Sequence, residues 1–455
     1  MIVATVPLSR LARAPARATG PQEAHGFSTE QGEHVLVVDA SRVYDVPTGF
    51  GRHLLEAASQ GGPQAELALL AAFGLERPPA IGPAVELPPV HALALAISQH
   101  CNLGCGYCYA DGGSFGGAAQ HMPWDVARAA VDRLFDTARD GRAVSLAFLG
   151  GEPLLNRSVL RQTVEHASTL AAARRVPLRL AITTNATMLS PDDAVFFADQ
   201  GFAVTVSIDG ERELHDALRP TLGGGGSYDR IVARLAPLLA LQGRRAMPGR
   251  PAMQVTARVT VTPRHTALRA TLEHLLSLGF HSVGFSPSLS ARDRSLELGG
   301  ADLQALLAQM IDCASEFERR TLAGEHYAFA NMLGALQEIH RGTHRPLPCG
   351  AGAGYLGVAA DGALSACHRF VGDERAAMGD VQQGIDDAAR GRWLSERHVD
   401  RQEPCRSCWA RYLCGGACHH EVLHRGRVAC DFIRGWLHHA LGAYVRISSA
   451  RPDVF

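Results

Sequence analysis

The chain has 455 residues, enough for two or three domains, and its formal net charge of −1 offers no basic field for nucleic acid. The sequence contains no lysine, so all 44 of its Lys and Arg residues are arginine. That absence excludes a Schiff-base lysine, a pyridoxal phosphate anchor and a Walker P-loop, which all need the amine. No apolar run reaches the roughly 18 residues of a membrane span, so we expect no membrane partner.

Residues 1–30 are predicted to be a disordered tail. The start of this segment is rich in Arg, Ala and Pro, and it lacks the apolar core of an export signal. Residues 34–46 predict a hairpin, because two β-rich runs flank the turn-forming Asp39-Ala40-Ser41. Two helical patterns follow between residues 51 and 74, and prolines within 78–89 indicate a linker.

From residue 91 to about residue 325, predicted strands alternate with predicted helices. This alternation implies an α/β fold with a parallel sheet covered by helices. Functional groups are expected at the carboxyl ends of such strands. The apolar strands are predicted near residues 92–98, 144–149, 178–183, 203–208, 254–261 and 282–286.

Three cysteines, Cys101, Cys105 and Cys108, follow the first of these strands. Cubane iron–sulfur clusters are normally held by four thiolates, so a triplet leaves one iron open for another ligand. A zinc knuckle and unrelated core cysteines are the alternatives. The spacing resembles the signature of the radical S-adenosylmethionine (SAM) superfamily. There the open iron binds the amino and carboxylate groups of SAM, whose cleavage yields a 5′-deoxyadenosyl radical.

The resemblance implies a partial (β/α)6 radical SAM barrel over residues 91–325 and a set of SAM contacts. Gly150-Gly151-Glu152-Pro153 follows the second strand, where the superfamily contacts the SAM amino group. Thr183-Thr184-Asn185 resembles a Thr-Asn-Gly turn, although Ala186 replaces the glycine. The residues assigned to SAM in this way are Tyr107, Gly150, Gly151, Glu152, Thr183, Asn185, Ser207 and Arg219.

The fourth strand carries a longer resemblance to peptide-modifying members. Ser207-Ile208-Asp209-Gly210 is followed by His215-Asp216, Arg219 and Gly226-Ser227-Tyr228. Ser207 would contact the ribose or the carboxylate of SAM. Arg219 would either pair with a carboxylate or shape the loop, and Tyr107 would either lie beside the adenine or pack as an ordinary aromatic.

Seven further cysteines lie beyond residue 346 and resemble the SPASM extension, which holds two auxiliary iron–sulfur clusters. A zinc ribbon is the alternative, since C-x2-C pairs suit zinc equally well. The resemblance implies a SPASM domain over residues 346–440 and three 4Fe–4S clusters in all. The distal cluster would use Cys405, Cys408, Cys414 and Cys430, and the proximal one Cys349, Cys367 and Cys418. The fourth proximal position would be open, or filled by Asp361, His368 or Cys313.

The strings from Cys367 to Gly372 and from Cys408 to His420 are similar to those of quinohemoprotein amine dehydrogenase maturation enzymes. That similarity implies thioether bonds between a cysteine sulfur and the methylene carbon of Asp or Glu. Sulfatase-maturing enzymes carry an aspartate where this chain has His368, and Asp209 and His368 are the candidate acid–base residues. Formylglycine formation, carbon–carbon crosslinking and a non-enzymatic iron–sulfur electron carrier are the alternatives.

The expected partners follow from this interpretation. The substrate would be a peptide or small protein containing Cys and Asp or Glu, and the electron donor a flavodoxin or ferredoxin. Residues 31–80 resemble the PqqD-like peptide-recognition element, which captures a leader by strand addition; a plain capping subdomain is the alternative. Eleven cysteines at metal-like spacings, without an export signal, predict a cytoplasmic protein.

Overall fold

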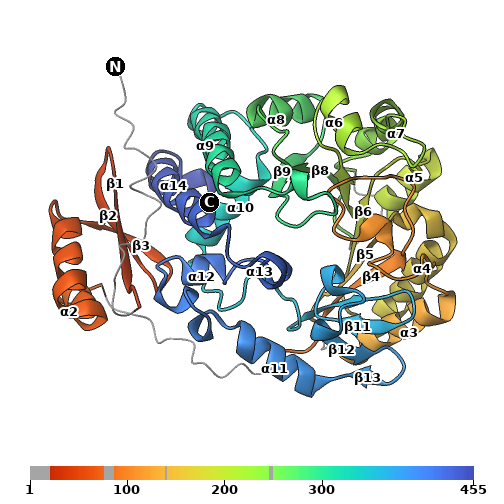
Figure 1. Cartoon of the computed structure of the whole chain (residues 1–455), viewed down its shortest axis with the longest axis horizontal. Helices are drawn as coiled ribbons and strands as arrows, with labels where there is room; N and C mark the ends of the chain where they lie inside the picture. Colours follow the sequence, from red (N-terminus) through yellow and green to blue (C-terminus); the bar gives the residue numbers. More distant parts are fainter. Residues whose placement is uncertain (1–20, 76–86, 139–140, 245–249) are drawn as a thin grey trace. The chain divides into compact units, whose positions relative to one another are not determined.

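The computed structural model describes residues 21–75, 87–138, 141–244 and 250–455. The chain divides into two compact units (Figure 1). We call Glu86–Leu298 with Gly350–Leu394 the barrel unit. The terminal unit contains both chain ends and consists of Met1–Val85, Gly299–Cys349 and Ser395–Phe455. Within the described residues, no helix is long and apolar enough to cross a membrane.

The barrel unit is built on a ten-stranded sheet in the order β13-β12-β11-β10-β4-β5-β6-β7-β8-β9. The stretch from β4 to β9 is entirely parallel, which confirms the predicted α/β fold class with its parallel radical SAM-type core. Each of these strands lies within one or two residues of its predicted position. Their bounds are β4 Ala92–Ser98, β5 Val144–Gly150, β6 Leu178–Thr184, β7 Ala203–Ser207, β8 Gln254–Val261 and β9 Ser282–Pro287.

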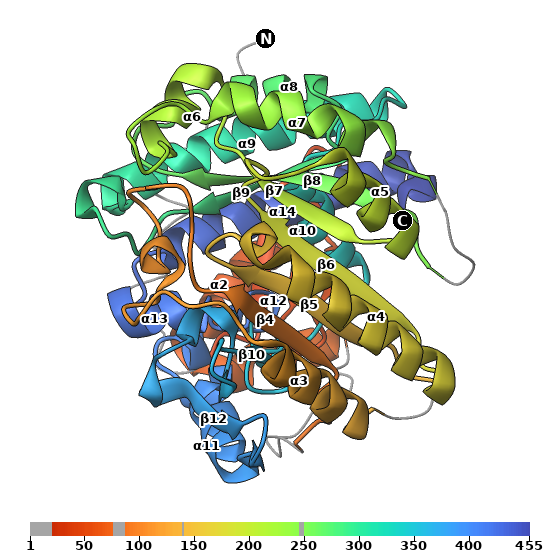
Figure 2. The ribbon, with the colours of Figure 1, turned by 90° about the vertical axis from the view of Figure 1, so that its right-hand side faces the viewer.

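Helices cover one face of the parallel strands (Figure 1), and Figure 2 shows α3 and α4 lying across β4, β5 and β6. Alternation along the strands produces this layering: in β8, Val255, Ala257 and Val259 are fully buried while the residues between them are accessible. The helices are α3 Trp124–Asp136, α4 Arg157–Arg174, α5 Pro191–Gln200, α6 Arg212–Leu218, α7 Tyr228–Ala240 and α8 Leu268–Ser277.

Helix α5 shows how local sequence sets the bounds of an element. Ser190 and Asp193 form a capping box at its start, and Pro191 occupies the first turn, where no backbone donor is needed. Gly201 ends the helix with φ 68°, a left-handed conformation that glycine adopts without strain.

Four short strands extend the sheet beyond β4. β10 Tyr355–Val358 pairs parallel with β4, and β11 Ala363–Ser365, β12 Ala377–Asp380 and β13 Gly384–Ile385 continue it antiparallel. Helix α11, Asp387–Arg397, follows them. These strands lie within residues 346–440, the predicted SPASM domain, and Leu356, Val358 and Leu364 are buried where the segment joins the barrel sheet.

The terminal unit contains a three-stranded antiparallel sheet, β1 Ala24–Thr29, β2 Gly32–Val37 and β3 Arg42–Val46. The predicted hairpin of residues 34–46 is thus present as β2 and β3. Strand β1 lies inside the segment predicted to be a disordered tail; it is ordered because it pairs with β2 and buries Ala24 and Phe27. Residues 1–20 of that predicted tail lie outside the described residues. Helix α2, Phe50–Ala72, merges the two predicted helical patterns across a kink at Gly62.

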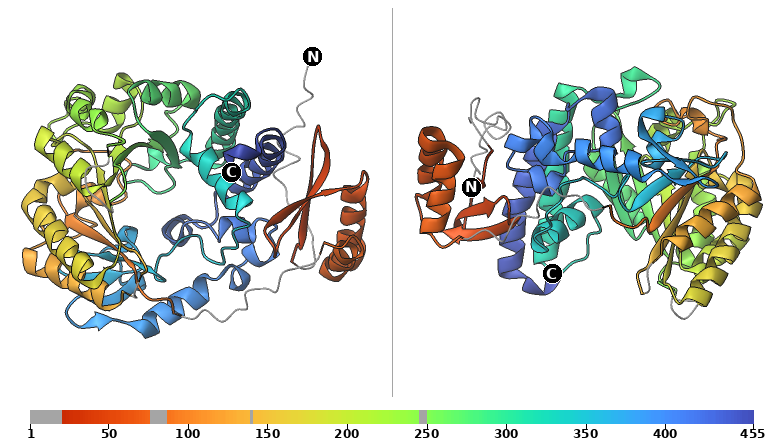
Figure 3. Two further views of the ribbon diagram at one scale, coloured as in Figure 1. Left: turned by 180° about the vertical axis from the view of Figure 1, so that it is seen from behind. Right: turned by 90° about the horizontal axis from the view of Figure 1, so that it is seen from below.

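Long helices complete the terminal unit. They are α9 Gly300–Leu322, α10 Ala330–His340 and α14 Cys430–Ala450, with the short α12 Arg411–Cys414 and α13 His419–Arg425. Helix α14 packs against both α9 and β1, and Figure 3 shows it beside the small sheet. A Cβ on Gly435 would lie 2.4 Å from Leu307, so glycine permits the close approach of α14 and α9. The sequence had assigned α9 to the barrel domain.

Candidate active site

The loop after β4 carries the cysteine triplet, and hydrogen bonds to neighbouring segments fix its course. Gly104 N donates to Pro220 O at 2.8 Å, and Asn102 Nδ2 donates to Thr187 Oγ1 at 2.8 Å. Burial raises the pKa of the Cys105 thiol to about 12 and also raises that of Cys101. Thiols in such surroundings need a nearby cation to become thiolates, and a bound metal supplies that charge.

Gly150 and Gly151 allow the end of β5 to lie directly against the start of this loop. A Cβ would lie 2.2 Å from Ser98 O at Gly150 and 2.3 Å from His100 O at Gly151. Gly151 N donates to Ser98 O at 2.8 Å, and Gly150 has φ 134°, which favours glycine. The two glycines therefore position the triplet loop, a role beyond the close approach to a ligand expected from the sequence.

Glu152 is fully buried and joins the ends of β5 and β6. Its Oε1 accepts hydrogen bonds from Leu154 N at 3.0 Å and Thr184 Oγ1 at 2.7 Å, and its Oε2 accepts from Asn185 N at 2.7 Å. Burial raises the pKa of this carboxyl, while the three donors oppose the rise. The sequence assigned this carboxylate to the SAM amino group; in the structure its oxygens already have backbone and hydroxyl partners.

Thr184 is the threonine that contributes to this network, and the SAM contact predicted for its neighbour Thr183 stays a prediction. Thr184 is 1% exposed, whereas Thr183 is exposed on the opposite face of β6. Leu178, Leu180 and Ile182 alternate with accessible residues along β6, so Thr184 lies on the same buried face of the strand. This alternation is present in the sequence, and the prediction overlooked it.

Asn185 brings an amide to the first cysteine of the triplet. Its Nδ2 lies 3.7 Å from Cys101 Sγ and 3.0 Å from Asn102 Oδ1, while its Oδ1 accepts from Thr187 N at 2.9 Å. Ala186, in place of the usual glycine, is buried with φ 59°, a conformation rare for residues with a Cβ. The predicted turn thus forms despite the missing glycine.

Tyr107, Asp209 and Arg219 form one buried network. Tyr107 OH donates to Asp209 Oδ2, Arg219 Nη1 donates to Tyr107 OH, and Arg219 Nη1 lies 3.8 Å from Asp209 Oδ2. Burial raises the pKa of Tyr107 well above its ordinary value, and Asp209 adds to the rise, so the phenol remains a donor. Arg219 therefore pairs with a carboxylate of the protein, and the SAM contacts predicted for Arg219 and Tyr107 stay predictions.

Asp209 has no face open to a substrate in the structure, although the sequence named it as an acid–base candidate. It is 0% exposed, and its Oδ1 accepts from Thr260 N at 3.0 Å. Its side chain holds the triplet loop to the ends of β7 and β8.

The rest of the string after β7 forms the turn around this network. His215 Nε2 lies 3.0 Å from Ser227 Oγ, which donates to Arg219 O at 2.6 Å, and Asp216 accepts from the backbone of Ser227 at 2.7 Å. A Cβ on Gly226 would lie 2.3 Å from Asp216 Oδ2. Burial lowers the pKa of His215 to about 3, so this histidine is neutral.

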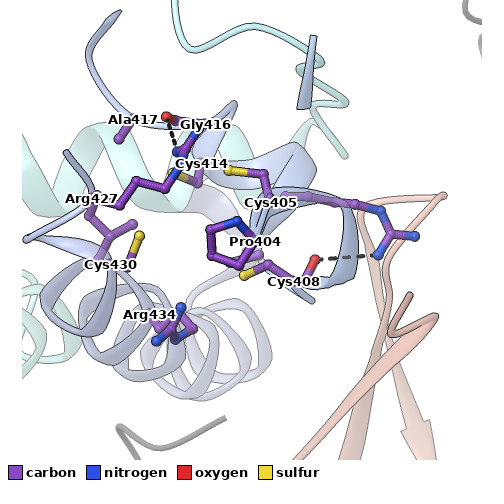
Figure 4. Close-up of a pocket in the computed structure, with 12 residues that line it drawn as sticks. Pro404, Cys405, Cys408, Cys414, Gly416, Ala417, Arg427, Cys430 and Arg434 are labelled. Atoms are coloured by element: carbon purple, nitrogen blue, oxygen red, sulfur yellow. Dashed lines mark hydrogen bonds between the residues drawn. The ribbon is translucent and has the colours of Figure 1, made fainter. Parts of the chain in front are cut away.

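In the terminal unit, the four cysteines predicted for the distal cluster line one pocket (Figure 4). They come from the loop before α12, from α12 and from the start of α14, and they are Cys405, Cys408, Cys414 and Cys430. Arg427 and Arg434 line the same pocket. Among the described residues, no three His, Cys, Asp or Glu side chains converge on a point suited to one metal ion. A four-iron cluster is larger than one ion and needs its thiolates further apart.

Cys367, predicted for the proximal cluster, is buried in the barrel unit just after β11. The next residues pack on Tyr109, which directly follows Cys108: the Arg369 guanidinium lies 4.5 Å from the Tyr109 ring centre and the His368 ring 6.2 Å. His368 Nδ1 lies 2.6 Å from Tyr355 OH, and burial lowers its pKa to about 4.

The other proximal candidates are distributed along the chain. Cys349 and Cys418 belong to the terminal unit, so the proximal set remains a prediction from the sequence. Of the side chains predicted for its fourth position besides His368, Cys313 is fully buried within α9, and Asp361 Oδ1 accepts from Ala363 N at 3.1 Å.

Comparison with known proteins defines the class. Residues 95–241 match the family model of the Radical SAM superfamily. The chain is 24% identical over 340 residues to an uncharacterized protein of Archaeoglobus fulgidus, covering 71% of this chain and 73% of that protein. It is 30% identical over 146 residues to the cysteine-type anaerobic sulfatase-maturating enzyme of Clostridium novyi, covering 30% of this chain and 37% of the enzyme.

Solved structures show the same fold. The anaerobic sulfatase-maturating enzyme anSMEcpe with bound AdoMet superposes with a TM-score of 0.64 at 20% identity, covering 80% of this chain and 96% of that one. Streptococcus suis SuiB bound to its precursor peptide SuiA has a TM-score of 0.52 at 13% identity, covering 89% and 96%. The chain carries a radical SAM domain and is a radical SAM enzyme, with SAM as its cofactor.

Proposed function

We propose that this radical SAM enzyme is a SPASM-type maturase that joins a cysteine sulfur to the methylene carbon of Asp or Glu in a peptide or protein. The observation that carries the maturase class is the pocket lined by Cys405, Cys408, Cys414 and Cys430, which supplies four thiols for an auxiliary cluster (Figure 4). The names of similar proteins support it: sulfatase-maturating enzymes modify proteins, and SuiB is bound to a precursor peptide.

The residues of the triplet loop fit an iron–sulfur cluster with an open site. Cys101, Cys105 and Cys108 would hold three irons, and the fourth iron would bind SAM. When bound, the cluster and SAM together would supply the radical that abstracts hydrogen from the substrate. The protein fixes the loop through the Tyr107–Asp209–Arg219 network and directs the Asn185 amide to Cys101.

The finer assignments extend this proposal. Three 4Fe–4S clusters would be present, with Cys349, Cys367 and Cys418 at the proximal one. His368, which packs on Tyr109, would be the acid–base residue of the reaction. The small sheet β1–β3 would bind the leader of the substrate along a strand edge, and a flavodoxin or ferredoxin would supply electrons.

Formylglycine formation is the second candidate, and the sulfatase-maturating relatives favour it at least as strongly. His368, where those enzymes carry an aspartate, favours the thioether reaction. The products differ chemically: a thioether keeps the sulfur and removes two hydrogens, whereas formylglycine made from cysteine loses the sulfur and gains an aldehyde.

The test uses anaerobically reconstituted enzyme with SAM, dithionite and a synthetic peptide that contains one Cys and one Asp. We expect a product lighter by two hydrogens whose sulfur resists alkylation. A hydrazide-reactive product without sulfur would instead establish formylglycine formation. A protein that binds iron but releases no 5′-deoxyadenosine would be an electron carrier, and the proposal would fail.

A further inference from the structure

The face of the barrel sheet opposite the helices is polar at its β7–β9 side. Several accessible positions of β7, β8 and β9 carry hydroxyl groups, among them Ser207, Thr256 and Ser286. Thr256 and Ser282 hydrogen-bond to each other at 3.0 Å. Arg258 of β8 is the one cation on this face of these three strands within the described residues.

Arg258 stands at the level of the SAM-contact residues predicted from the sequence. In the strand register, Arg258 pairs with Ser207, the last residue of β7. The preceding row across the sheet joins Thr184, Val206 and Ala257. The Thr184 row belongs to the Glu152 and Asn185 network beside the triplet loop. Arg258 is therefore placed near the carboxyl ends of the strands, where this class of sheet binds ligands.

The Arg258 guanidinium combines solvent access with partial desolvation. Its side chain is accessible to solvent, and burial of part of it lowers its pKa. No carboxylate or carbonyl within the described residues forms a hydrogen bond or ion pair with it. Other enclosed arginines of the barrel unit have such partners: Arg157 binds Asp193 at 2.8 Å, and Arg390 binds Asp387 at 2.6 Å. A desolvated arginine keeps its charge and gains most from a planar anion.

We infer that Arg258 binds the carboxylate of the acidic residue that the substrate peptide presents for crosslinking. This inference rests on the proposed function. The carboxylate of SAM is the competing ligand, but by the family resemblance it binds the open iron at the triplet after β4. The triplet loop also reaches β8, because Asp209 bonds both Tyr107 and Thr260 N, so the binding test must separate the two carboxylates. A thiol or hydroxyl substrate would leave the cation unpaired.

The test measures binding separately from turnover. Two fluorescent synthetic peptides, one with Cys and Asp and one with Cys and Asn, are titrated by anisotropy into reconstituted wild-type and Arg258→Gln enzymes. We expect Arg258→Gln to weaken binding of the Asp peptide about 10- to 100-fold. Binding of the Asn peptide should not change. Arg258→Lys should recover part of the loss, because the charge remains while the planar fork is absent.

Arg179→Gln is the matched control, because Arg179 is an exposed arginine on β6, near the opposite end of its strand. It should leave binding of both peptides unchanged. The inference is overturned if Arg258→Gln weakens SAM binding instead, or lowers both peptide affinities equally. Iron content and peptide-independent SAM cleavage report folding of the variant. Failure of the wild-type enzyme to crosslink the Asp peptide would contradict the proposed reaction. Unchanged binding of the Asp peptide by Arg258→Gln would contradict only this inference.

Discussion

Tyr107 supplies the hydroxyl that bridges a buried cation and a buried carboxylate. It accepts from Arg219 and donates to Asp209, and all three side chains are less than 9% exposed. Removing one member of such a network leaves charged groups short of a partner in a low-dielectric surrounding, where the cost is high. The conformational stability of the triplet loop should therefore depend on the hydroxyl group of Tyr107.

Tyr107→Phe is expected to lower the free energy of unfolding by about 1.5–3 kcal/mol, because the lost hydrogen bonds involve charged partners. Chemical denaturation monitored by circular dichroism measures it. Tyr228→Phe is the matched control, since Tyr228 OH bonds the side chain of His274 at 2.7 Å and should cost only about 1 kcal/mol. Equal losses in the two variants would show that the network has no special role.

Arg434 sets the charge next to the predicted distal cluster. It faces the thiols of Cys408 and Cys430 in the pocket of Figure 4 and also pairs with Asp431. A neighbouring cation stabilises the more negative, reduced form of a cluster. Arg434→Gln is therefore expected to lower the reduction potential of the distal cluster in an EPR-monitored titration.

Arg406→Gln provides the comparison for this prediction. Arg406 directly follows Cys405, another predicted ligand of this cluster, but its side chain is 62% exposed and its guanidinium binds Glu403 at 2.8 Å. Screening by solvent should leave the potential of this variant at the wild-type value. A distal potential that does not respond to Arg434→Gln would mean that the guanidinium does not face the cluster.

At the scale of elements, the contact between the end of β5 and the triplet loop has no room for a side chain. Gly151→Ala would place a methyl group 2.3 Å from His100 O and 2.9 Å from Cys101 N, so the first cluster ligand must move. We expect reduced iron content and lost SAM cleavage in this variant, with the auxiliary cluster signals retained.

Gly391→Ala tests whether any added methyl group has this effect. Gly391 is in helix α11, where an added Cβ would meet nothing within 4 Å, and alanine is a better helix former. Its iron content and SAM cleavage should match the wild-type enzyme. Full iron content in Gly151→Ala would refute the proposed role of this contact.

Strand positions followed from sequence because each parallel strand is a short run rich in apolar residues, separated from the next by a helical pattern. The hydrogen-bond partners of individual site residues were harder to predict from the sequence. Nothing in the local sequence of Glu152 shows that Thr184 and Asn185, on the next strand, satisfy its carboxylate. The strands β10–β13 were also missed, since they have only two to four residues and gain their stability by extending an existing sheet.

At the scale of the whole molecule, sequence order and spatial units do not coincide. The terminal unit combines residues from the start, middle and end of the chain. Arg411, three residues after Cys408, is 4% exposed on its side chain and binds Glu23 and Asp39, each at 3.2 Å. The predicted recognition element is thereby linked to the distal-cluster segment, a connection that no local pattern in either segment reveals.

Buried neutral histidines are expected to lower the folding stability of the protein at acidic pH. Burial lowers the pKa of His25 and His215 to about 3 and that of His439 to about 4. The unfolded chain takes up these protons below about pH 6.5, whereas the folded chain does not until the pH reaches the lowered values. Stability is therefore fully present above the unfolded pKa and is lost as the pH falls toward 4 and then 3.

Each such histidine should contribute a slope of up to about 1.4 kcal/mol per pH unit between about pH 6 and pH 4. His25→Gln removes one of them: its ring stacks on Trp409 at 3.7 Å and bonds His438 at 2.9 Å. This variant should be less stable near neutral pH but should lose stability more slowly on acidification. Urea unfolding across this range measures both slopes, and parallel curves for wild type and variant would show that His25 is already protonated in the fold.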